Sequence, residues 1–361
     1  MNLTRSLFLV AMAFAVAASV NPAYADDNRY DAKVLVADIE PAPHLDPHLV
    51  NPWGIAFNPN GFVWVADNGT GFSTLYDGLG NPQSLVVTIP AAPGSTDHGK
   101  PTGIVFNTGG GFAVSIPGKN PGNSAFLFAT EDGLIAGWAP SVDLTHAIQG
   151  YPKAGDPPSG AVYKGLAIAT SAVGNTIYAA DFLGGKIDVF NSTFTKVSLA
   201  GDFSDPDLQK DFSPFNIQNI NGNLFVMYAK REEGEDEEIT GPSLGIVNEF
   251  DANGHLLRRF ATRGRLNAPW GIALAPATFG AFANDILIGN FGDGAINAYD
   301  AATGEFKGRL RGTDHRELRL DGLWGMAFGN DLNNQPKSTL FFAAGPDDET
   351  HGIYGSIAPA P

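Results

Sequence analysis

A segment of about twenty residues returns six times along the chain, and this repetition constrains the fold more than any other feature of the sequence. Each copy begins with an apolar run that usually contains a central glycine, passes through a turn rich in Asn, Gly and Pro, and ends in a second apolar run. The aligned central positions are Gly54, Gly103, Gly165, Asn216, Gly271 and Gly325, at intervals of roughly 50 to 60 residues. Such a chain folds as a series of similar units that pack on one another.

The units are predicted to be the blades of a β-propeller. In most copies the two apolar strands are followed by a third strand that ends in an acidic turn, as in "TLYDGLGN" and "AINAYDAATG", and then by a fourth. Four short strands in a unit of about 50 residues are typical of such a blade. No long window has the periodicity of an amphipathic helix, so the fold class is all-β. We expect six blades, near residues 51–99, 100–162, 163–212, 213–267, 268–321 and 322–357.

The two ends of the chain are predicted to meet in the last blade. The sixth copy runs out of chain after its third strand, "HGIYGSIAP". The segment "AKVLVADI" (residues 32–39) can supply the missing outer strand, which removes the open edges of a linear array. Residues 26–361 then form a single six-bladed domain. The central glycines agree with this arrangement, because inner strands crowd around the axis, where a side chain would block close backbone approach.

The first 25 residues have the pattern of a secretory signal peptide. Arg5 precedes an apolar run from Leu7 to Val20, and "AYA" places small residues before a cleavage point that follows Ala25. A retained membrane anchor is the alternative, although the run is shorter than the ~20 residues of a spanning helix. We therefore predict a secreted or periplasmic protein with no membrane insertion after cleavage.

The composition restricts the partners. A formal net charge of −16 repels phosphate backbones, which argues against a nucleic acid partner. The absence of cysteine excludes disulfides, thiolate metal sites and cysteine nucleophiles. We expect a monomer that binds a small molecule, a glycan or a protein. The acidic segment "KREEGEDEEITG" (residues 230–241) is expected to be a solvated loop.

Residues 51–68, "NPWGIAFNPNGFVWVADN", resemble the NHL-type propeller repeat, in which a Pro-x-Gly-Ile-Ala strand precedes a strand ending in Val-Ala-Asp. With "GKPTGIVFN" and "APWGIALAP", they make the whole mature chain similar to a family of uncharacterised exported propeller proteins that are mostly bacterial. Some members of that family end in a C-terminal sorting tail for surface display, whereas this chain ends in "GSIAPAP". The resemblance implies a fold and no particular activity.

Candidate binding residues are sought at one mouth of the axial channel. Loops that enter the inner strands and leave the second strands lie on the same face of a propeller, and ligands usually bind there. The loops also include Tyr163 and Lys164, and long loops collect polar residues in any case. The repeated tryptophans either line the mouth or pack as wedges between blades. The predicted site is His48, Asn51, Trp53, Asn68, His98, Lys100, Asp181, Asn216, Lys230, Trp270, Asn290 and Trp324.

Calcium is the metal that these residues favour. Asn68, Asp181, Asn216 and Asn290 come from four blades and offer oxygen ligands near the axis, which suits Ca²⁺. Six-bladed hydrolases of the gluconolactonase and paraoxonase types use Asp, Asn and Glu in this way, but no Glu stands at the start of an inner strand here. We therefore expect a binding or scaffold protein, with a calcium-dependent hydrolase or lactonase as the alternative.

Overall fold

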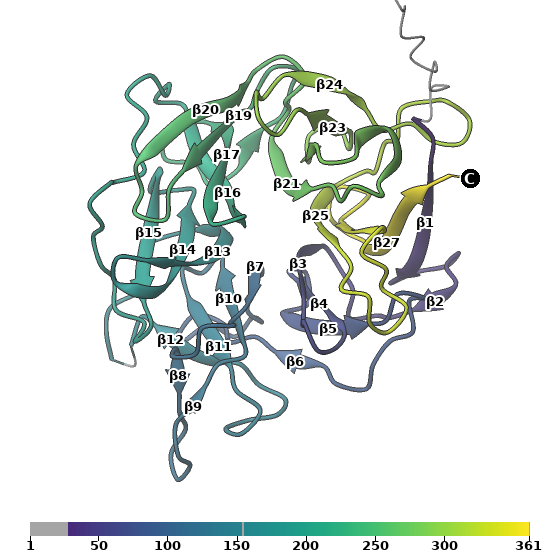
Figure 1. Cartoon of the computed structure of the whole chain (residues 1–361). Helices are drawn as coiled ribbons and strands as arrows, with labels where there is room; N and C mark the ends of the chain where they lie inside the picture. The colour runs from purple at the N-terminus through teal and green to yellow at the C-terminus, as the bar shows by residue number, and fades with distance from the viewer. Residues whose placement is uncertain (1–27, 154, 361) are drawn as a thin grey trace, which may run out of the picture.

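The repeats form a ring of six blades in the computed structural model, which describes residues 28–153 and 155–360 (Figure 1). The first blade contains β3 (Pro52–Phe57), β4 (Val63–Asp67), β5 (Phe72–Tyr76) and β6 (Val87–Thr88). The second contains β7 (Pro101–Phe106), β10 (Phe126–Thr130), β11 (Ile135–Trp138) and β12 (Ile148–Tyr151), and the third contains β13 (Tyr163–Ser171), β14 (Gly174–Asp181) and β15 (Lys186–Asn191). The fourth contains β16 (Phe212–Ile220), β17 (Asn223–Arg231), β19 (Ile246–Phe250) and β20 (Leu256–Thr262), with β18 (Glu238–Ile239) paired to β17. The fifth contains β21 (Pro269–Leu274), β22 (Ile286–Asn290), β23 (Ile296–Tyr299) and β24 (Phe306–Arg309).

The sixth blade joins the two ends of the chain. Its strands are β25 (Leu323–Phe328), β26 (Leu340–Ala344), β27 (Ile353–Pro359), β1 (Tyr30–Ala37) and β2 (His44–Leu45). The outer strand β1 pairs antiparallel with β27, from Tyr30 opposite Pro359 to Ala37 opposite Ile353, and the two strands lie side by side in Figure 1. The predicted all-β, six-bladed fold and its closure by the N-terminal strand are confirmed. The predicted signal peptide lies outside the described residues.

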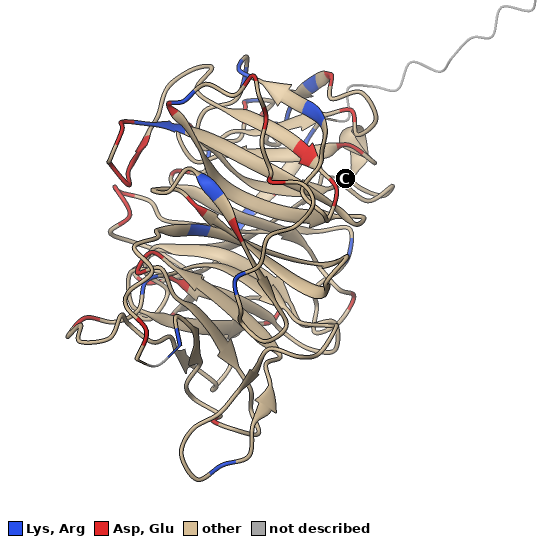
Figure 2. Cartoon of the chain, turned by 90° about the vertical axis from the view of Figure 1, so that its left-hand side faces the viewer, with Lys and Arg blue, Asp and Glu red and all other residues tan. Residues whose placement is uncertain are grey.

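Each blade is covered on both faces by its neighbours, which explains the apolar runs of its inner strands. All five residues of β4, "VWVAD", are buried. Between the first two blades, Trp64 packs on Phe126 and Trp138 in one of the core clusters. Seen from the side, many of the charged residues lie in loops (Figure 2). Helical structure in the described part of the chain is a 3₁₀ turn, η1 (Gly280–Phe282), so none of it is a helix long enough to cross a membrane.

The inner strands β3, β7, β13, β16, β21 and β25 contact one another in turn around the axis. The repeated glycines permit this contact. A Cβ atom on Gly325 would lie 2.4 Å from the carbonyl oxygen of Trp53 in the next blade, and one on Gly271 would lie 2.5 Å from that of Trp324. The predicted reason for these glycines is therefore correct.

Gly325→Ala is expected to destabilise the protein by about 1–3 kcal/mol or more, because the added methyl group meets backbone that cannot move without opening the ring. Gly61→Ala is the matched control, since its Cβ would contact only the flexible side chain of Asn58, at 3.2 Å. Thermal unfolding followed by circular dichroism measures both. Equal melting temperatures for the two variants would contradict the crowding argument.

Blade two departs from the prediction. The repeat indicates "GFAVSIPG" as its second strand, but that position is taken by β10. Residues 113–123 instead form a small hairpin, β8 (Ala113–Val114) and β9 (Gly122–Asn123). The cause is local packing: Phe112 is fully buried against Phe194, and its N–H donates to Ser192 of blade three. The long connection at residues 139–162 consequently contains the outer strand β12.

Blade three is also irregular. It has three strands, and its outer edge is reduced to a bridge between Phe190 and Lys196. The chain turns at residues 192–194 and returns along β15, where the N–H of Asn191 donates to the Thr195 carbonyl and the N–H of Val197 donates to the Val189 carbonyl. Phe194, in the turn, is buried in the core shared with blade two.

Candidate functional site at the axial mouth

Three tryptophans from three blades close the axial channel near the face where the chain enters the inner strands. Trp53 stacks on Trp324, with ring centroids 3.7 Å apart, and Trp270 meets Trp324 edge to face at 5.7 Å. Their exposed fractions are 4% or less. Phe182, Phe215 and Phe291 complete this aromatic plug. The tryptophans of neighbouring blades thus pack on one another at the mouth, and the prediction that they line it for a ligand stays a prediction.

A buried lysine lies against the plug. Lys164, near the start of β13, is 2% exposed, and its Nζ atom lies 5.5 Å from the ring centroid of Trp53 and 5.2 Å from that of Phe182. The indole N–H of Trp270 donates to the Lys164 carbonyl at 2.9 Å, which holds the start of the strand in place. Ring faces carry partial negative charge, so they stabilise an ammonium group.

Carboxylates from two other blades neutralise this ammonium. Its Nζ atom lies 3.2 Å from Oε2 of Glu238, 3.8 Å from Oε2 of Glu237 and 3.9 Å from Oε1 of Glu131. Burial lowers the pKa of Lys164, but the carboxylates outweigh it, so that the pKa is raised and the lysine stays charged. A buried charge that is paired in this way is tolerated, whereas an unpaired one is very costly.

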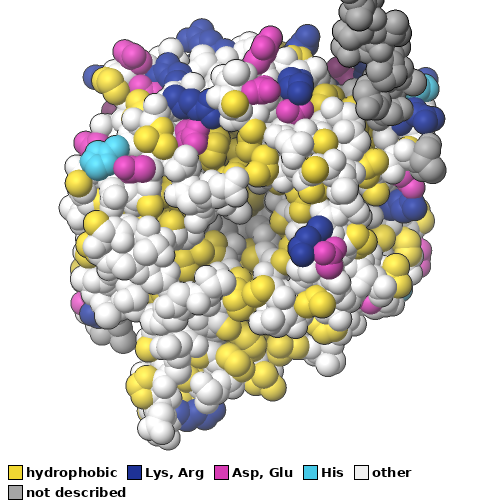
Figure 3. All heavy atoms as spheres, viewed as in Figure 1, with side chains coloured by type: hydrophobic (Ala, Val, Ile, Leu, Met, Phe, Trp, Pro, Cys, Tyr) yellow, Lys and Arg dark blue, Asp and Glu magenta, His cyan; other side chains and the backbone are white. Residues whose placement is uncertain are grey.

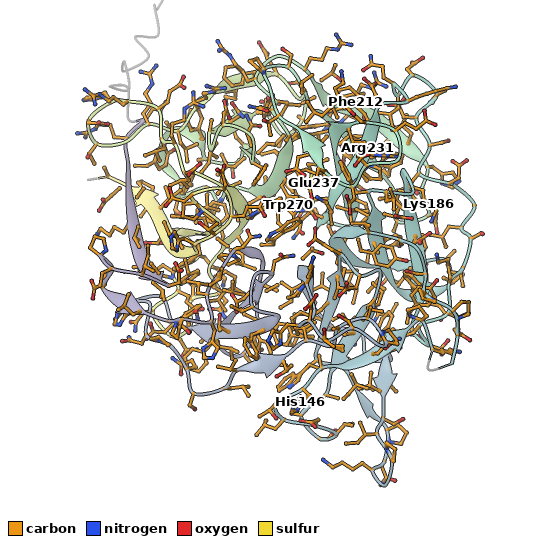
Figure 4. All side chains as sticks on the ribbon, turned by 180° about the vertical axis from the view of Figure 1, so that it is seen from behind. His146, Lys186, Phe212, Arg231, Glu237 and Trp270 are labelled. Atoms are coloured by element: carbon orange, nitrogen blue, oxygen red, sulfur yellow. The ribbon has the colours of Figure 1, made fainter. Side chains whose placement is uncertain are left out.

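The acidic segment 230–241 is therefore only partly the solvated loop that its composition indicates. The Glu237 side chain is 80% exposed, but that of Glu238 is 5% exposed because the short strand β18 pairs with β17 and turns it toward Lys164. In Figure 4, Glu237 and Trp270 lie toward the centre of the ring, whereas His146 lies at its periphery.

A chain of hydrogen bonds extends the site across blades one, two and six. The indole N–H of Trp324 donates to Asn51 Oδ1 at 3.1 Å, and Asn51 Nδ2 donates to Glu349 Oε2 at 2.6 Å. Asn68 Nδ2 donates to Glu131 Oε2 at 3.0 Å. We call the connected set the mouth cluster; its members are Asn51, Asn68, Glu131, Lys164, Glu238 and Glu349.

Glu349 is the member of the mouth cluster that can change its protonation state near neutral pH. Burial raises its pKa to about 7, the hydrogen bond from Asn51 opposes this shift, and the carboxylate of Glu238 adds to it. Its backbone is strained as well, since Asp347, Asp348 and Glu349 all have left-handed φ angles, of 55°, 51° and 64°. Strain of this kind concentrates at functional sites.

The structure separates the four predicted calcium ligands. Only Asn68 joins the mouth cluster. Asp181 accepts hydrogen bonds from the N–H groups of Val162 and Gly184 and pairs with Lys186 at 2.9 Å, and Asn290 ties together the loop at residues 265–293. Asn216 donates to the Trp270 carbonyl and lines a cavity of about 20 Å³ below the plug. Among the described residues no three His, Asp or Glu side chains are arranged to hold a metal ion.

The remaining predicted residues lie outside the cluster. His48 pairs with Asp46 at 2.9 Å, and His98 and Lys100 are exposed. Lys230, expected near the axis, pairs instead with Asp211 at 3.3 Å. The prediction that they bind a ligand remains untested.

Three glutamates of the cluster were not identified from the sequence. Glu131 follows the second strand of blade two, which the repeat had assigned to residues 111–118, so correct alignment of that blade would have found it. Glu238 lies in the acidic segment, and Glu349 comes directly after the Asp347 and Asp348 pair at a second-strand exit. For these two, the sequence signal was an acidic residue in a loop on the correct face.

Comparisons with known proteins support the fold. The family model described as NHL repeat matches residues 49–71. A structural genomics protein of unknown function from Bacteroides thetaiotaomicron superposes with a TM-score of 0.54 at 11% identity, over 91% of this chain and 76% of that one. Virginiamycin B lyase from Staphylococcus aureus (TM-score 0.50, 13% identity, 91% and 99% covered) and the soluble aldose sugar dehydrogenase from Escherichia coli (TM-score 0.50, 12% identity, 92% and 100% covered) are also similar. At these identities the likeness concerns the fold alone.

Two relatives are similar along most of their sequence. Uncharacterized protein L690 of Acanthamoeba polyphaga mimivirus is 35% identical over 323 residues, which span 88% of this chain and 82% of the relative. Uncharacterized protein R648 of the same virus is 35% identical over 324 residues, 88% and 76% of the two chains. These relatives are viral, so they lend no support to the expected family of exported bacterial proteins. The chain belongs to the same protein family as these two mimivirus proteins.

Proposed function

We propose that the protein is an exported binding module that recognises a positively charged group of its ligand at the mouth cluster. The observation that carries this proposal is the convergence of Glu131 and Glu238, from two different blades, on the buried Lys164, with Glu349 of a third blade connected to them through Asn51 and Asn68. A small molecule, a glycan or a protein can each present an amine or a guanidinium group to such a site.

The charges at the mouth do not balance. Lys164 is buried, whereas Glu237, Glu131 and Glu349 keep part of their surface accessible from outside. A ligand cation at this mouth would therefore meet more negative than positive charge, in surroundings where the aromatic plug excludes water from one side. Attraction between charges is stronger in such a partly desolvated site than at the open surface.

The test is isothermal titration calorimetry with two ligands of equal length. Cadaverine carries two ammonium groups, and 1,5-pentanediol carries hydroxyls in their place. We expect saturable binding of cadaverine alone, and at least a tenfold weaker affinity in Glu131→Gln, which is a loss of about 1.4 kcal/mol. Glu305→Gln, at an exposed turn of blade five, is the control. Equal binding of the diol, or equal loss in the control, would refute recognition of charge at the mouth.

Protonation of Glu349 is expected to make stability depend on pH. Its ordinary pKa is 4.5 and its folded pKa is about 7, so between these values the folded protein holds a proton that the unfolded chain releases. Stability therefore falls as the pH rises from about 4.5 to about 7. Because solvent still reaches this half-buried group, the expected size of the fall is only about 1–2 kcal/mol.

Urea unfolding at pH 5 and pH 8 measures this change, and Glu349→Gln should remove it while leaving other carboxyl groups to titrate. The affinity of the wild-type protein for cadaverine should rise as the pH increases from about 5 to about 8, because Glu349 then becomes negatively charged. The groups that face it are Asn51, Lys164, Glu131 and Glu238. A pH profile of Glu349→Gln that is superimposable on that of the wild type would show that this group does not titrate near 7.

The calcium-dependent hydrolase has less support. The four oxygen ligands expected for it make separate sets of hydrogen bonds, and within the mouth cluster the ammonium of Lys164 already lies between the carboxylates that a divalent cation would need. The residues present therefore do not fit this metal site. Elemental analysis of dialysed protein provides the check, and one Ca²⁺ per chain would favour the hydrolase instead.

Export and a monomeric state belong to the same proposal. They rest on the signal-peptide pattern of residues 1–25 and on the ring of the described blades, in which the inner edge strands contact one another around the axis. N-terminal sequencing of protein from the culture medium or periplasm should begin at Asp26. Light scattering should give the mass of one chain.

A further inference from the structure

The opposite end of the axis opens into a funnel between the inner strands. Its walls are the second halves of those strands, and five of its side chains are half-buried apolar groups: Phe57, Phe106, Ile168, Leu274 and Phe328. Two adjoining hollows of about 550 and 340 Å³ make up this apolar funnel. Figure 3 shows the face hollowed at its centre, with hydrophobic side chains around the hollow.

The funnel differs chemically from the mouth cluster. None of the residues that line its two hollows is charged or titratable, although the protein carries a net charge of −16. The aromatic plug separates the two ends of the axial channel. The cavity of about 20 Å³ lies between the plug and the funnel. A charged ligand would find no counter-charge in the funnel, so the site favours an uncharged one.

The side chain of Gln218 lies at the base of the funnel. Gln218 of β16 lines both hollows and also the small cavity above them. Its side-chain amide makes no hydrogen bond to other described residues, unlike that of the adjacent Asn219, which donates to the Ile168 carbonyl at 2.8 Å. A free amide at the end of an apolar pocket offers one fixed point of hydrogen bonding, which is the usual composition of a small-molecule site.

We propose that the apolar funnel is a second binding site, for a small uncharged molecule with an apolar body and one group that hydrogen-bonds to the amide of Gln218. The phenylalanines provide the apolar walls, and each packs against another aromatic ring: Phe57 on Phe341 at 5.5 Å, Phe106 on Phe126 at 5.1 Å and Phe328 on Phe279 at 5.0 Å between ring centroids. The walls are thus preformed rather than assembled around the ligand.

Two fluorescent dyes with the same aromatic body test the proposal. N-phenyl-1-naphthylamine is uncharged and has one N–H donor, whereas 8-anilinonaphthalene-1-sulfonate carries a negative charge. Fluorescence titration of the full mature chain should show one saturable site for the uncharged dye and at least tenfold weaker binding of the sulfonate. Equal or tighter binding of the sulfonate would overturn the proposal.

Variants assign the binding to the funnel. Phe328→Asp places a charge in the wall and should weaken binding of the uncharged dye more than tenfold. Gln218→Leu removes no hydrogen bond of the fold and should weaken it roughly threefold to tenfold. Leu257→Asp, at an exposed leucine of β20, is the matched control and should change nothing. If Phe328→Asp and Gln218→Leu both fold and both bind the dye like the wild type, the funnel is not the site.

Discussion

A chain that begins at residue 45 is expected to lose its cooperative unfolding transition rather than fray at one end. The truncation removes β1, whose Tyr30 and Val36 are fully buried and which pairs with β27 along its length. Burial of each large apolar side chain contributes about 1.5–3 kcal/mol, and the strand also satisfies the backbone of its partner. The total loss of more than about 5 kcal/mol is comparable to the whole stability of a typical domain.

The control is a chain that begins at residue 28 and keeps β1. Differential scanning calorimetry should give this chain the melting temperature of the mature protein, whereas the chain from residue 45 should show a much lower transition or none. A shared melting temperature would mean that the ring does not depend on its N-terminal strand.

Lys164→Met is expected to destabilise the protein by about 3–5 kcal/mol. Methionine fills the space of the lysine stem, but Glu238 is then left buried without its counter-charge, and Glu131 loses a partner. Breaking a buried pair costs more than the pair contributes when intact. Urea unfolding of the variant measures the loss.

Two further variants separate this effect from a general loss of charge. Lys230→Met removes an ion pair whose members are 35% and 47% exposed, and should change stability by at most about 0.5–1 kcal/mol. Adding Glu238→Gln to Lys164→Met should restore part of the stability, because a neutral amide tolerates burial better than a carboxylate. If Lys164→Met and Lys230→Met have equal effects, Lys164 is not the buried centre of the site.

The fold was predictable because each repeat carries both a local strand pattern and a glycine that marks the contact between inner strands of neighbouring blades. Blades one, five and six carry the Trp-Gly pair at the same position, and the glycine reports directly on contact between inner strands. Blade two shows the limit of this reasoning. Its residues 112–118 have the alternation of a strand, but Phe112 is buried in blade three, a contact that no local pattern could indicate.

The site was only partly predictable for a related reason. Asn51, Asn68 and the three tryptophans were expected at the mouth, and the structure brings them together. Asp181 and Asn290 occupy the same kind of position, yet their side chains bond to their own loops. A sequence does not distinguish an acidic or amide side chain that closes a turn from one that faces the axis, because both occupy the same place in the repeat.

The signals of the five indole N–H groups in a ¹⁵N-correlated NMR spectrum test the central claim most directly, because the chain contains its own controls. Trp53, Trp270 and Trp324 form the plug beneath the mouth cluster, whereas Trp64 and Trp138 lie in the core between the first two blades. Recognition of a cation at the mouth predicts that cadaverine shifts the signals of the first three and leaves those of Trp64 and Trp138 in place. Saturable binding that moves none of the three plug signals, or moves all five alike, would contradict it.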